Sequence, residues 1–362
     1  MGELLEVVVT AGTLAFVVPE GVDDPGRVSG GNVYDRRLRD GLHAEGWEVR
    51  MVEVPVQAAP GPSTASVLAG LPDGALVLVD GLLVPGAADA LARHASRLRE
   101  VVLAHQAPER PDDRLLAALR STQRVIATSG WTRSELVEQD AADPRRIVVA
   151  QPGADLAPAS TPSPGGERLL CVAAVAPHKG QDLLVRALAG LTATPGWSCV
   201  IVGSLGVDPD FAAALAAVVE ATGLAERVTF AGVLGGEALE AAYASADLLV
   251  HPARSESYGM VVAEALAHGV PVLTTEVGGI PEALDRPGAA LIVPPDDAWA
   301  LQIALQRWWS SAPLREELRA EALLARAGAR SWDTTTAVVA AALAEAAATS
   351  TEAESAHRAA TR

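Results

Sequence analysis

The chain of 362 residues contains few cysteines, few aromatic residues and a single lysine. Its two cysteines, Cys171 and Cys199, each stand within a hydrophobic run, and neither has a second Cys or His at the spacing of a zinc site. We expect both to be buried, reduced thiols, which fits a reducing compartment. The 45 acidic residues outnumber the 28 basic ones, and the formal net charge of -17 opposes binding to nucleic acid or anionic membranes.

Long apolar runs and basic leader segments are also missing. No segment approaches the roughly 18 consecutive apolar residues of a membrane-spanning helix. The N-terminus carries Glu3 and Glu6 where a secretory signal peptide would carry Lys or Arg, so we expect a cytoplasmic protein. With 49% hydrophobic residues, the composition excludes disorder, and the length predicts about two domains.

The hydrophobic pattern predicts an α/β fold with two Rossmann-like, doubly wound domains. Short runs of Val, Ile and Leu alternate with longer amphipathic stretches, as in βα units whose parallel strands are covered on both faces. Two series of strands are expected, the first at 14–18, 49–54, 75–80, 101–104, 124–128 and 147–150, and the second at 169–173, 198–203, 228–230, 248–250, 272–274 and 291–293.

A segment rich in Pro, Ser and Gly separates the two series and marks the domain boundary. We expect an N-terminal domain (1–156), a linker (157–166), a C-terminal domain (167–312), C-terminal helices (313–348) of which the last packs back on the first domain, and a disordered tail (349–362). Two such domains facing each other would form a cleft at the carboxyl ends of their strands, where ligands bind.

The lone lysine is Lys179, in the sequence Ala176-Pro-His-Lys-Gly180. It follows a hydrophobic strand and precedes an expected helix, so its ammonium can lie beside the positive end of that helix. An anion would meet a compact charge and unpaired backbone N–H groups there. We favour a phosphate contact over the alternative of an ordinary surface lysine.

Two glutamates, Glu256 and Glu264, flank the start of another expected helix. Eight positions along a helix separate two residues by about 12 Å, whereas the carboxylates of a glycosidase lie about 5 to 9.5 Å apart. The pair could instead hold two ends of an extended ligand, one accepting ribose hydroxyls and the other sugar hydroxyls. The N–H groups of Gly259, Met260 and Val261 would face a diphosphate between them. The alternative is a helix cap at Glu256 and a solvated Glu264, but the neighbours of Glu264 are nearly all apolar.

These motifs resemble those of the retaining glycosyltransferases of family 4, which have the GT-B fold. The matching segments are Glu256 to Glu264 (Glu-x7-Glu), His268-Gly-Val-Pro-Val272, Gly278-Gly-Ile-Pro-Glu282, the Lys179-Gly180 loop, Val200-Ile-Val-Gly203, Ser29-Gly-Gly-Asn32, His105, Thr128-Ser-Gly-Trp-Thr-Arg133 and Gln151-Pro-Gly-Ala-Asp155. Together they cover nearly the whole chain in the family's order. The resemblance implies that the domain 1–156 lies on the acceptor side and that the domain 167–312 binds the nucleotide sugar.

The resemblance implies a role for each matching residue in transferring a hexosyl unit from a nucleoside-diphosphate sugar to an acceptor hydroxyl, with no metal and no cofactor. Lys179 would contact the donor diphosphate, while Glu256 and His105 would face the transferred sugar. Glu264 would bind the ribose. Backbone groups would come from Gly30 and Gly31 at the phosphate, Tyr258, Gly259, Met260 and Val261 at the sugar and phosphates, and Gly232 and Val233 at the base.

One departure concerns the second phosphate-binding cation. The family commonly has an Arg five positions before the loop lysine, where this chain has Ala174. Arg254 or the cluster of Arg36, Arg37 and Arg39 could replace it. For that cluster we prefer a solvated face to a lipid-headgroup contact.

Three open points remain. Asp208-Pro-Asp210 matches the metal-binding Asp-x-Asp pattern, but its position before a helix favours a helix cap. An epimerase or hydrolase of the same architecture, acting on sugar nucleotides, is a second functional hypothesis. A sugar-nucleotide sensor without turnover is a third, motivated by Ala174. The sequence does not identify the base, the sugar or the acceptor.

Overall fold

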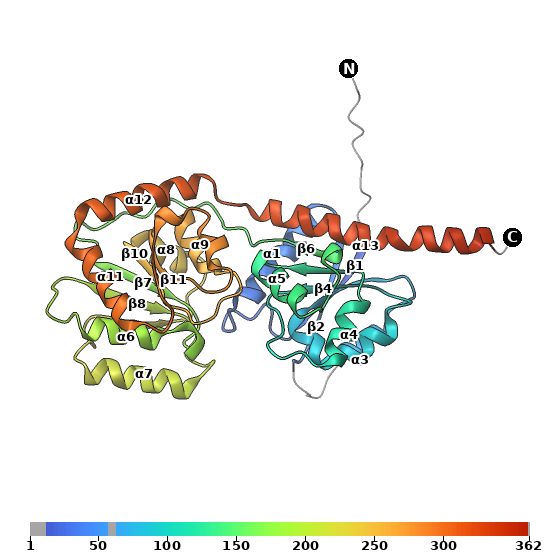
Figure 1. Ribbon diagram of the computed structural model, residues 1–362, viewed down its shortest axis with the longest axis horizontal. Helices are drawn as coiled ribbons and strands as arrows, with labels where there is room; N and C mark the ends of the chain where they lie inside the picture. The colour runs from blue at the N-terminus through green and yellow to red at the C-terminus, as the bar shows by residue number, and fades with distance from the viewer. Residues whose placement is uncertain (1–11, 57–62, 361–362) are drawn as a thin grey trace, which may run out of the picture. The chain divides into compact units, whose positions relative to one another are not determined.

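The computed structural model describes residues 12–56 and 63–360, which form two compact units (Figure 1). Within the described residues, unit 1 comprises residues 12–23, 31–56, 63–151 and 332–360, and unit 2 comprises residues 24–30 and 152–331. The acidic N-terminal segment with Glu3 and Glu6 lies outside the described residues. None of the helices among the described residues is long and apolar enough to cross a membrane.

Unit 1 is built on a parallel sheet of six strands in the order β2-β1-β3-β4-β5-β6. Both of its faces are covered, which explains why its central strands read as continuous hydrophobic runs. The strands are β1 (Thr13–Pro19), β2 (Glu48–Val54), β3 (Leu76–Asp80), β4 (Arg99–Ala104), β5 (Arg124–Ala127) and β6 (Ile147–Val149).

The helices of unit 1 pack in two layers. On one face the buried core includes residues of α2 (Thr64–Gly70), α3 (Val84–His94), α4 (Asp113–Ser121) and α5 (Gly130–Glu138). On the other face it includes residues of α1 (Gly30–Ala44) and α13 (Trp332–Ala360), the helix drawn in red along unit 1 in Figure 1. Single 3-10 turns lie at η1 (Gly81–Leu83) and η2 (Pro144–Arg146).

The helix α13 corrects one expectation. The sequence predicts a disordered tail from residue 349, but the helix continues to Ala360. Residues 349–360 contain neither Pro nor Gly and are rich in Ala and Glu, which are good helix formers, so nothing in the composition ends the helix at Ala348.

Unit 2 repeats the architecture with a parallel sheet in the order β12-β11-β10-β7-β8-β9. Its strands are β7 (Arg168–Val172), β8 (Ser198–Val202), β9 (Val228–Gly232), β10 (Leu248–His251), β11 (Val272–Thr275) and β12 (Ala290–Val293). Its helices are α6 (Gln181–Ala189), α7 (Pro209–Ala221), α8 (Glu237–Ser245), α9 (Met260–Ala267), α10 (Ile280–Leu284), α11 (Ala298–Ser310) and α12 (Ala312–Ala327), with 3-10 turns η3 (Pro177–Lys179) and η4 (Pro287–Ala289).

The strand order of unit 2 reverses between β7 and β10. From β7 the chain runs outward through β8 to β9, then returns to place β10 against the other side of β7. At such a switch point the loops that follow the two central strands diverge and leave a crevice at the carboxyl ends of the strands. The loops after β7 and β10 are those that carry Lys179 and Glu256.

The predicted thiols and the segment between the two strand series can now be placed. Cys171 in β7 and Cys199 in β8 are buried and unpaired, as the sequence predicts. The Pro-rich segment 157–166 contains neither helix nor strand and is hydrogen-bonded along unit 2, for example from Ser160 N to His268 O at 2.8 Å and from Thr161 N to Ala244 O at 3.0 Å.

A glycine fixes the loop that follows η3. Gly180 has φ +71°, a conformation that L residues rarely adopt, and a Cβ atom there would lie 2.0 Å from the carbonyl oxygen of Pro252. This close backbone approach presses the loop after β7 against the loop after β10. Gly223, after α7, has nearly the same φ of +70° but open space around its Cβ position.

The two glycines make a matched test of this contact. We expect Gly223→Ala to cost about 1 to 2 kcal/mol, the cost of the left-handed backbone alone. Gly180→Ala should cost a further 1 to 3 kcal/mol or so, because the backbone of Pro252 must also move. Urea denaturation followed by circular dichroism measures both, and equal losses would show that the loops are not packed this closely.

Candidate functional site

The loops after β7 and β10 bring Lys179 and Glu256 into direct contact. The N–H groups of Arg254 and Ser255 both donate to the carbonyl oxygen of His178, at 2.8 and 3.4 Å, so the backbones of the two loops are joined. Lys179 Nζ donates to Glu256 Oε2 at 2.7 Å, and both side chains are mostly buried. The sequence assigned the two residues to one ligand but did not predict that they form an ion pair.

A third residue, His251, completes this group and was missed by the sequence analysis. It is the last residue of β10, is only 1% exposed, and its Nε2 lies 3.2 Å from the same oxygen of Glu256. Burial alone would raise the pKa of Glu256, but the hydrogen bond from His251 and the charge of Lys179 outweigh it and hold that pKa well below its usual range. The sequence signal that could have identified His251 is its position as a polar residue at the end of the apolar run 248–250.

Two glycines support the Glu256 loop from the other side. The N–H of Gly279 donates to the carbonyl oxygen of Glu256 at 3.1 Å. A Cβ atom at Gly278, where φ is +55°, would lie 1.7 Å from that oxygen, and one at Gly279 would lie 2.2 Å from the carbonyl oxygen of Ser257. The Gly278-Gly279 pair therefore allows the backbone approach that holds this loop in place.

The helix α9 begins four residues after Glu256. Gly259 precedes it with φ +96°. The N–H groups of Met260 and Val261 lie in the first turn of the helix, where no intrahelical acceptor is available. Tyr258 is buried. Because Glu256 lies in the loop rather than on the helix, the separation of about 12 Å expected for a continuous helix does not describe the Glu256–Glu264 pair.

Glu264 projects from α9 and has a partner. Tyr243, on α8, donates its hydroxyl to Glu264 Oε2 at 2.8 Å. Burial raises the pKa of Glu264 to about 7, while the hydrogen bond from Tyr243 and the nearby His268 lower it in part. The sequence predicts that a glutamate in this apolar helix needs a partner or a ligand. Tyr243, which the sequence analysis did not identify, is such a partner within the protein.

Arg254, a candidate for the second phosphate-binding cation, is already engaged. Its guanidinium donates to both carboxylate oxygens of Asp182 at 2.7 and 2.9 Å, to Asp296 and to the carbonyl oxygen of Pro177. It therefore joins α6 to the loops after β7 and β10. Using it for a ligand would break several charge-assisted hydrogen bonds, so the structure argues against this substitution for the missing arginine.

Two arginines of the α1 cluster also have protein partners. Arg36 donates to the carbonyl oxygen of Val22, and Arg39 forms ion pairs with Asp23 and Asp40. These contacts fit the expected surface role better than a lipid contact. Asp208 accepts a hydrogen bond from the N–H of Phe211 at 3.0 Å and caps α7, as the sequence predicts.

In unit 1, His105 follows β4 and lies between two buried carboxylates. Its Nε2 is 3.0 Å from Asp35 Oδ1 and 3.3 Å from Asp80 Oδ2. Burial lowers the pKa of His105, but Asp35 and Asp80 outweigh it and raise this pKa to about 10. A Cβ atom at Gly31 would lie 3.4 Å from the ring, so the absence of a side chain there leaves the imidazole room.

The same three residues form the candidate metal-ligand cluster found among the described residues. The nitrogen that would bind a metal is, however, the one that faces both carboxylates, and the high pKa of His105 favours its protonated form, which cannot be a ligand. His105 pairs with both carboxylates, while Asp35 Oδ2 is buried without a hydrogen-bond partner among the described residues. The absence of a metal requirement stays a prediction.

The remaining predicted contacts involve backbone groups. Gly232 ends β9 with φ +68° and accepts a hydrogen bond from the N–H of Gly203 at 2.8 Å, and Val233 follows it. Gly30 is the first residue of α1 and is exposed. The structure thus brings Lys179, Glu256 and the start of α9 together in unit 2.

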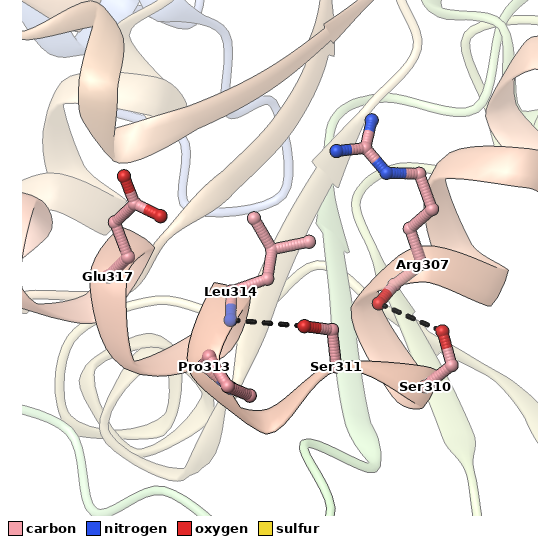
Figure 2. Close-up of a pocket in the computed structure, with 6 residues that line it drawn as sticks. All are labelled: Arg307, Ser310, Ser311, Pro313, Leu314 and Glu317. Atoms are coloured by element: carbon pink, nitrogen blue, oxygen red, sulfur yellow. Dashed lines mark hydrogen bonds between the residues drawn. The ribbon is translucent and has the colours of Figure 1, made fainter.

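A surface hollow of about 330 Å³ lies elsewhere, at the turn between α11 and α12 (Figure 2). It is lined by Arg307, Ser310, Ser311, Pro313, Leu314 and Glu317. Ser311 Oγ accepts from Leu314 N and caps α12, while Ser310 Oγ donates to Arg307 O. These hydroxyls serve the helix ends, and the hollow contains none of the predicted site residues.

The raised pKa of Glu264 predicts a pH effect on stability. Because the folded state binds this proton more tightly than an ordinary glutamate with a pKa of 4.5, the carboxyl favours folding most below about pH 4.5, and this contribution is lost as the pH rises through about 7. Between pH 5 and 8, wild type should lose about 1 to 3 kcal/mol more unfolding free energy than Glu264→Gln. Urea denaturation at both pH values measures this.

The exposed Glu317→Gln is the control for that experiment and should follow wild type. If Glu264→Gln also follows wild type, Glu264 titrates like a solvated carboxyl and the burial argument is wrong.

Comparison with known proteins identifies the second half of the chain. Residues 156–324 match the family model described as "Glycosyl transferases group 1". D-inositol 3-phosphate glycosyltransferases from Segniliparus rotundus and Actinosynnema mirum are each 30% identical, over 67% and 68% of this chain. The chain spans only 58% and 63% of the length of these two relatives.

Solved structures share the fold across most of the chain. Anabaena Alr3699/HepE in complex with UDP-glucose aligns with a TM-score of 0.74 over 92% of this chain and 99% of its own, at 19% identity. Sucrose-phosphate synthase from Thermosynechococcus elongatus aligns with a TM-score of 0.71 over 90% and 96%, at 22% identity. Residues 156–324 are therefore similar to the glycosyl transferases group 1 family, and the two Rossmann-like α/β units give the chain the GT-B fold.

Proposed function

We propose that the protein is a retaining, metal-independent glycosyltransferase of family 4, which transfers a hexosyl unit from a nucleoside-diphosphate sugar to an acceptor hydroxyl. The observation that carries the proposal is the group formed by Lys179, Glu256 and the first turn of α9 in unit 2. It offers one cation, one ionised carboxylate and free backbone N–H groups, which are the chemical partners of a phosphate next to a sugar.

The diphosphate is assigned to Lys179 and α9. The N–H groups of Met260 and Val261 and the positive end of the helix attract an anion, and Gly259 lets it approach the backbone. In the described structure the Lys179 ammonium is held by Glu256. A bound diphosphate would compete for that ammonium, so donor binding is expected to weaken or replace the Lys179–Glu256 pair.

The two carboxylates are assigned to hydroxyl groups. In the part of the chain that the structure describes, Glu256 Oε1 accepts the N–H of Ser257 at 3.2 Å. It keeps lone pairs that can accept from a sugar hydroxyl. Glu264 accepts from Tyr243 through Oε2 and is left with Oε1 for a ribose hydroxyl. Backbone groups of Gly232 and Val233 would hold the base.

The reaction itself needs the leaving group to be stabilised. As the bond from the anomeric carbon to the diphosphate oxygen breaks, negative charge grows on that oxygen, where Lys179 and the N–H groups of α9 stabilise it. The acceptor hydroxyl attacks the anomeric carbon and passes its proton to the departing diphosphate. His105, held as an imidazolium by Asp35 and Asp80, would hydrogen-bond the sugar.

The comparisons guide the choice of substrates to test. The HepE structures contain UDP or UDP-glucose, and the curated relatives are named for D-inositol 3-phosphate. We therefore place UDP-sugars first among the donors and inositol phosphates first among the acceptors.

The donor can be identified by thermal shift. A UDP-sugar, a GDP-sugar and an ADP-sugar are each titrated against the protein, and the matching base should stabilise it by about 2.7 kcal/mol at 100 times its dissociation constant. Free UDP, GDP and ADP serve as references for the part of the affinity that does not depend on the sugar. If no nucleotide of the panel shifts the transition, donor binding is refuted.

Turnover tests the role of the lysine. Lys179→Ala should lower kcat, measured as release of the nucleoside diphosphate, by about 100- to 1,000-fold. This is the usual effect of removing one preorganised charge-stabilising group. Arg114→Ala is the matched control, because Arg114 forms an exposed ion pair with Asp89 in unit 1 and its loss should leave kcat unchanged. Undiminished turnover in Lys179→Ala would contradict the assignment.

The same assays separate the alternatives. Free sugar or an epimer formed without any acceptor would favour an epimerase or hydrolase. Tight donor binding without turnover across a broad acceptor panel would favour a sensor. Transfer that depends on an added acceptor and is lost in Lys179→Ala supports the transferase.

A further inference from the structure

His251 differs from Lys179 in how firmly it is held against Glu256. Lys179 is 20% exposed and reaches Glu256 Oε2 through a flexible side chain, whereas His251 is 1% exposed and belongs to β10. The carbonyl oxygen of His251 also accepts a hydrogen bond from Thr274 Oγ1 at 2.9 Å, and the two residues are paired in the sheet. The imidazole therefore stays where the strand places it.

The orientation of the ring follows from its partners. A carboxylate can only accept hydrogen bonds, so Nε2 must carry the proton that it shares with Glu256. Nδ1 is buried and has no hydrogen-bond partner among the residues that the structure describes. A proton on Nδ1 would be an unsatisfied buried donor, which is costly, so of the two tautomers the one with hydrogen on Nε2 fits the site.

The two side chains that donate to Glu256 Oε2 therefore have different freedom to move. If Lys179 turned toward a diphosphate, Glu256 Oε2 would lose one donor and the Ser257 N–H would remain on Oε1. A buried carboxylate with so few donors would be costly to keep ionised. His251 remains in place because its backbone is part of the sheet.

We propose that His251 is a positioning residue, which holds the Glu256 carboxylate in place while Lys179 exchanges that carboxylate for the donor diphosphate. This proposal rests on the function proposed above. His251 keeps its hydrogen bond to Oε2, so that Oε1 continues to face the sugar.

Two substitutions separate this role from simple packing. A glutamine side chain presents its amide nitrogen near the position of Nε2, whereas an asparagine presents it near the position of Nδ1. We expect His251→Gln to keep kcat for transfer from UDP-glucose, or from the donor identified by thermal shift, within about threefold, and His251→Asn to lose about 10- to 100-fold. Both variants are checked by circular dichroism and urea denaturation.

We expect His251→Asn to lose more activity than His251→Gln. The loss should appear in kcat more than in KM, because Lys179 and α9, which are assigned to donor binding, remain intact. Equal losses in the two variants, or no loss in either, would overturn the positioning role. Lowered stability alone, with kcat preserved in the folded fraction of both, would show that His251 only packs.

A readout without turnover keeps this test independent of the proposed function. Long-range nitrogen–proton NMR on ¹⁵N-labelled protein, with the seven histidines assigned by substitution, reports which ring nitrogen of His251 carries hydrogen. We expect the Nε2–H form in wild type and in Lys179→Met. An Nδ1–H form would overturn the proposal even if transfer is found. Absent transfer with the Nε2–H form present would count against the proposed function instead.

Discussion

The interaction on which the candidate site depends is the ion pair between Lys179 and Glu256, with His251 on the same carboxylate oxygen. It exists because β7 and β10 are neighbours in the sheet although their residues are far apart in the chain. The reversal of strand order places the two loops side by side, and Gly180 and Gly278 allow backbone contacts that a side chain would block. Sheet topology thus determines the chemistry at this edge.

The fold could be predicted from hydrophobic patterning because its strands are buried on both faces. The expected strand at 75–80 corresponds to β3 (Leu76–Asp80), and that at 272–274 to β11 (Val272–Thr275). Such runs are read directly from the sequence, since parallel strands covered by helices lack polar alternation. The end of α13 could not be predicted in the same way, because residues 349–360 carry no helix-breaking signal and no apolar stripe that would distinguish a helix from a polar tail.

The site could be predicted only in part, because residue types are visible in a sequence and partnerships are not. Lys179 and Glu256 were recognisable from their context, but 77 positions separate them, and nothing local shows that one neutralises the other. The same limit hid Tyr243 as the partner of Glu264. It also left Arg254 as a candidate cation, although Asp182, 72 positions away, already binds it.

Charge balance explains how a site with one lysine could hold a diphosphate. Ala174 removes the second cation common in the family, and Arg254 is held by Asp182 and Asp296. On the function proposed above, a diphosphate carries more negative charge than one ammonium offsets, and the N–H groups and dipole of α9 would supply part of the remaining stabilisation. In the structure, the Lys179 ammonium is paired with the Glu256 carboxylate. Since His251 also donates to this carboxylate, Glu256 can release Lys179 without becoming an isolated buried charge, and the lone lysine then becomes available to the ligand.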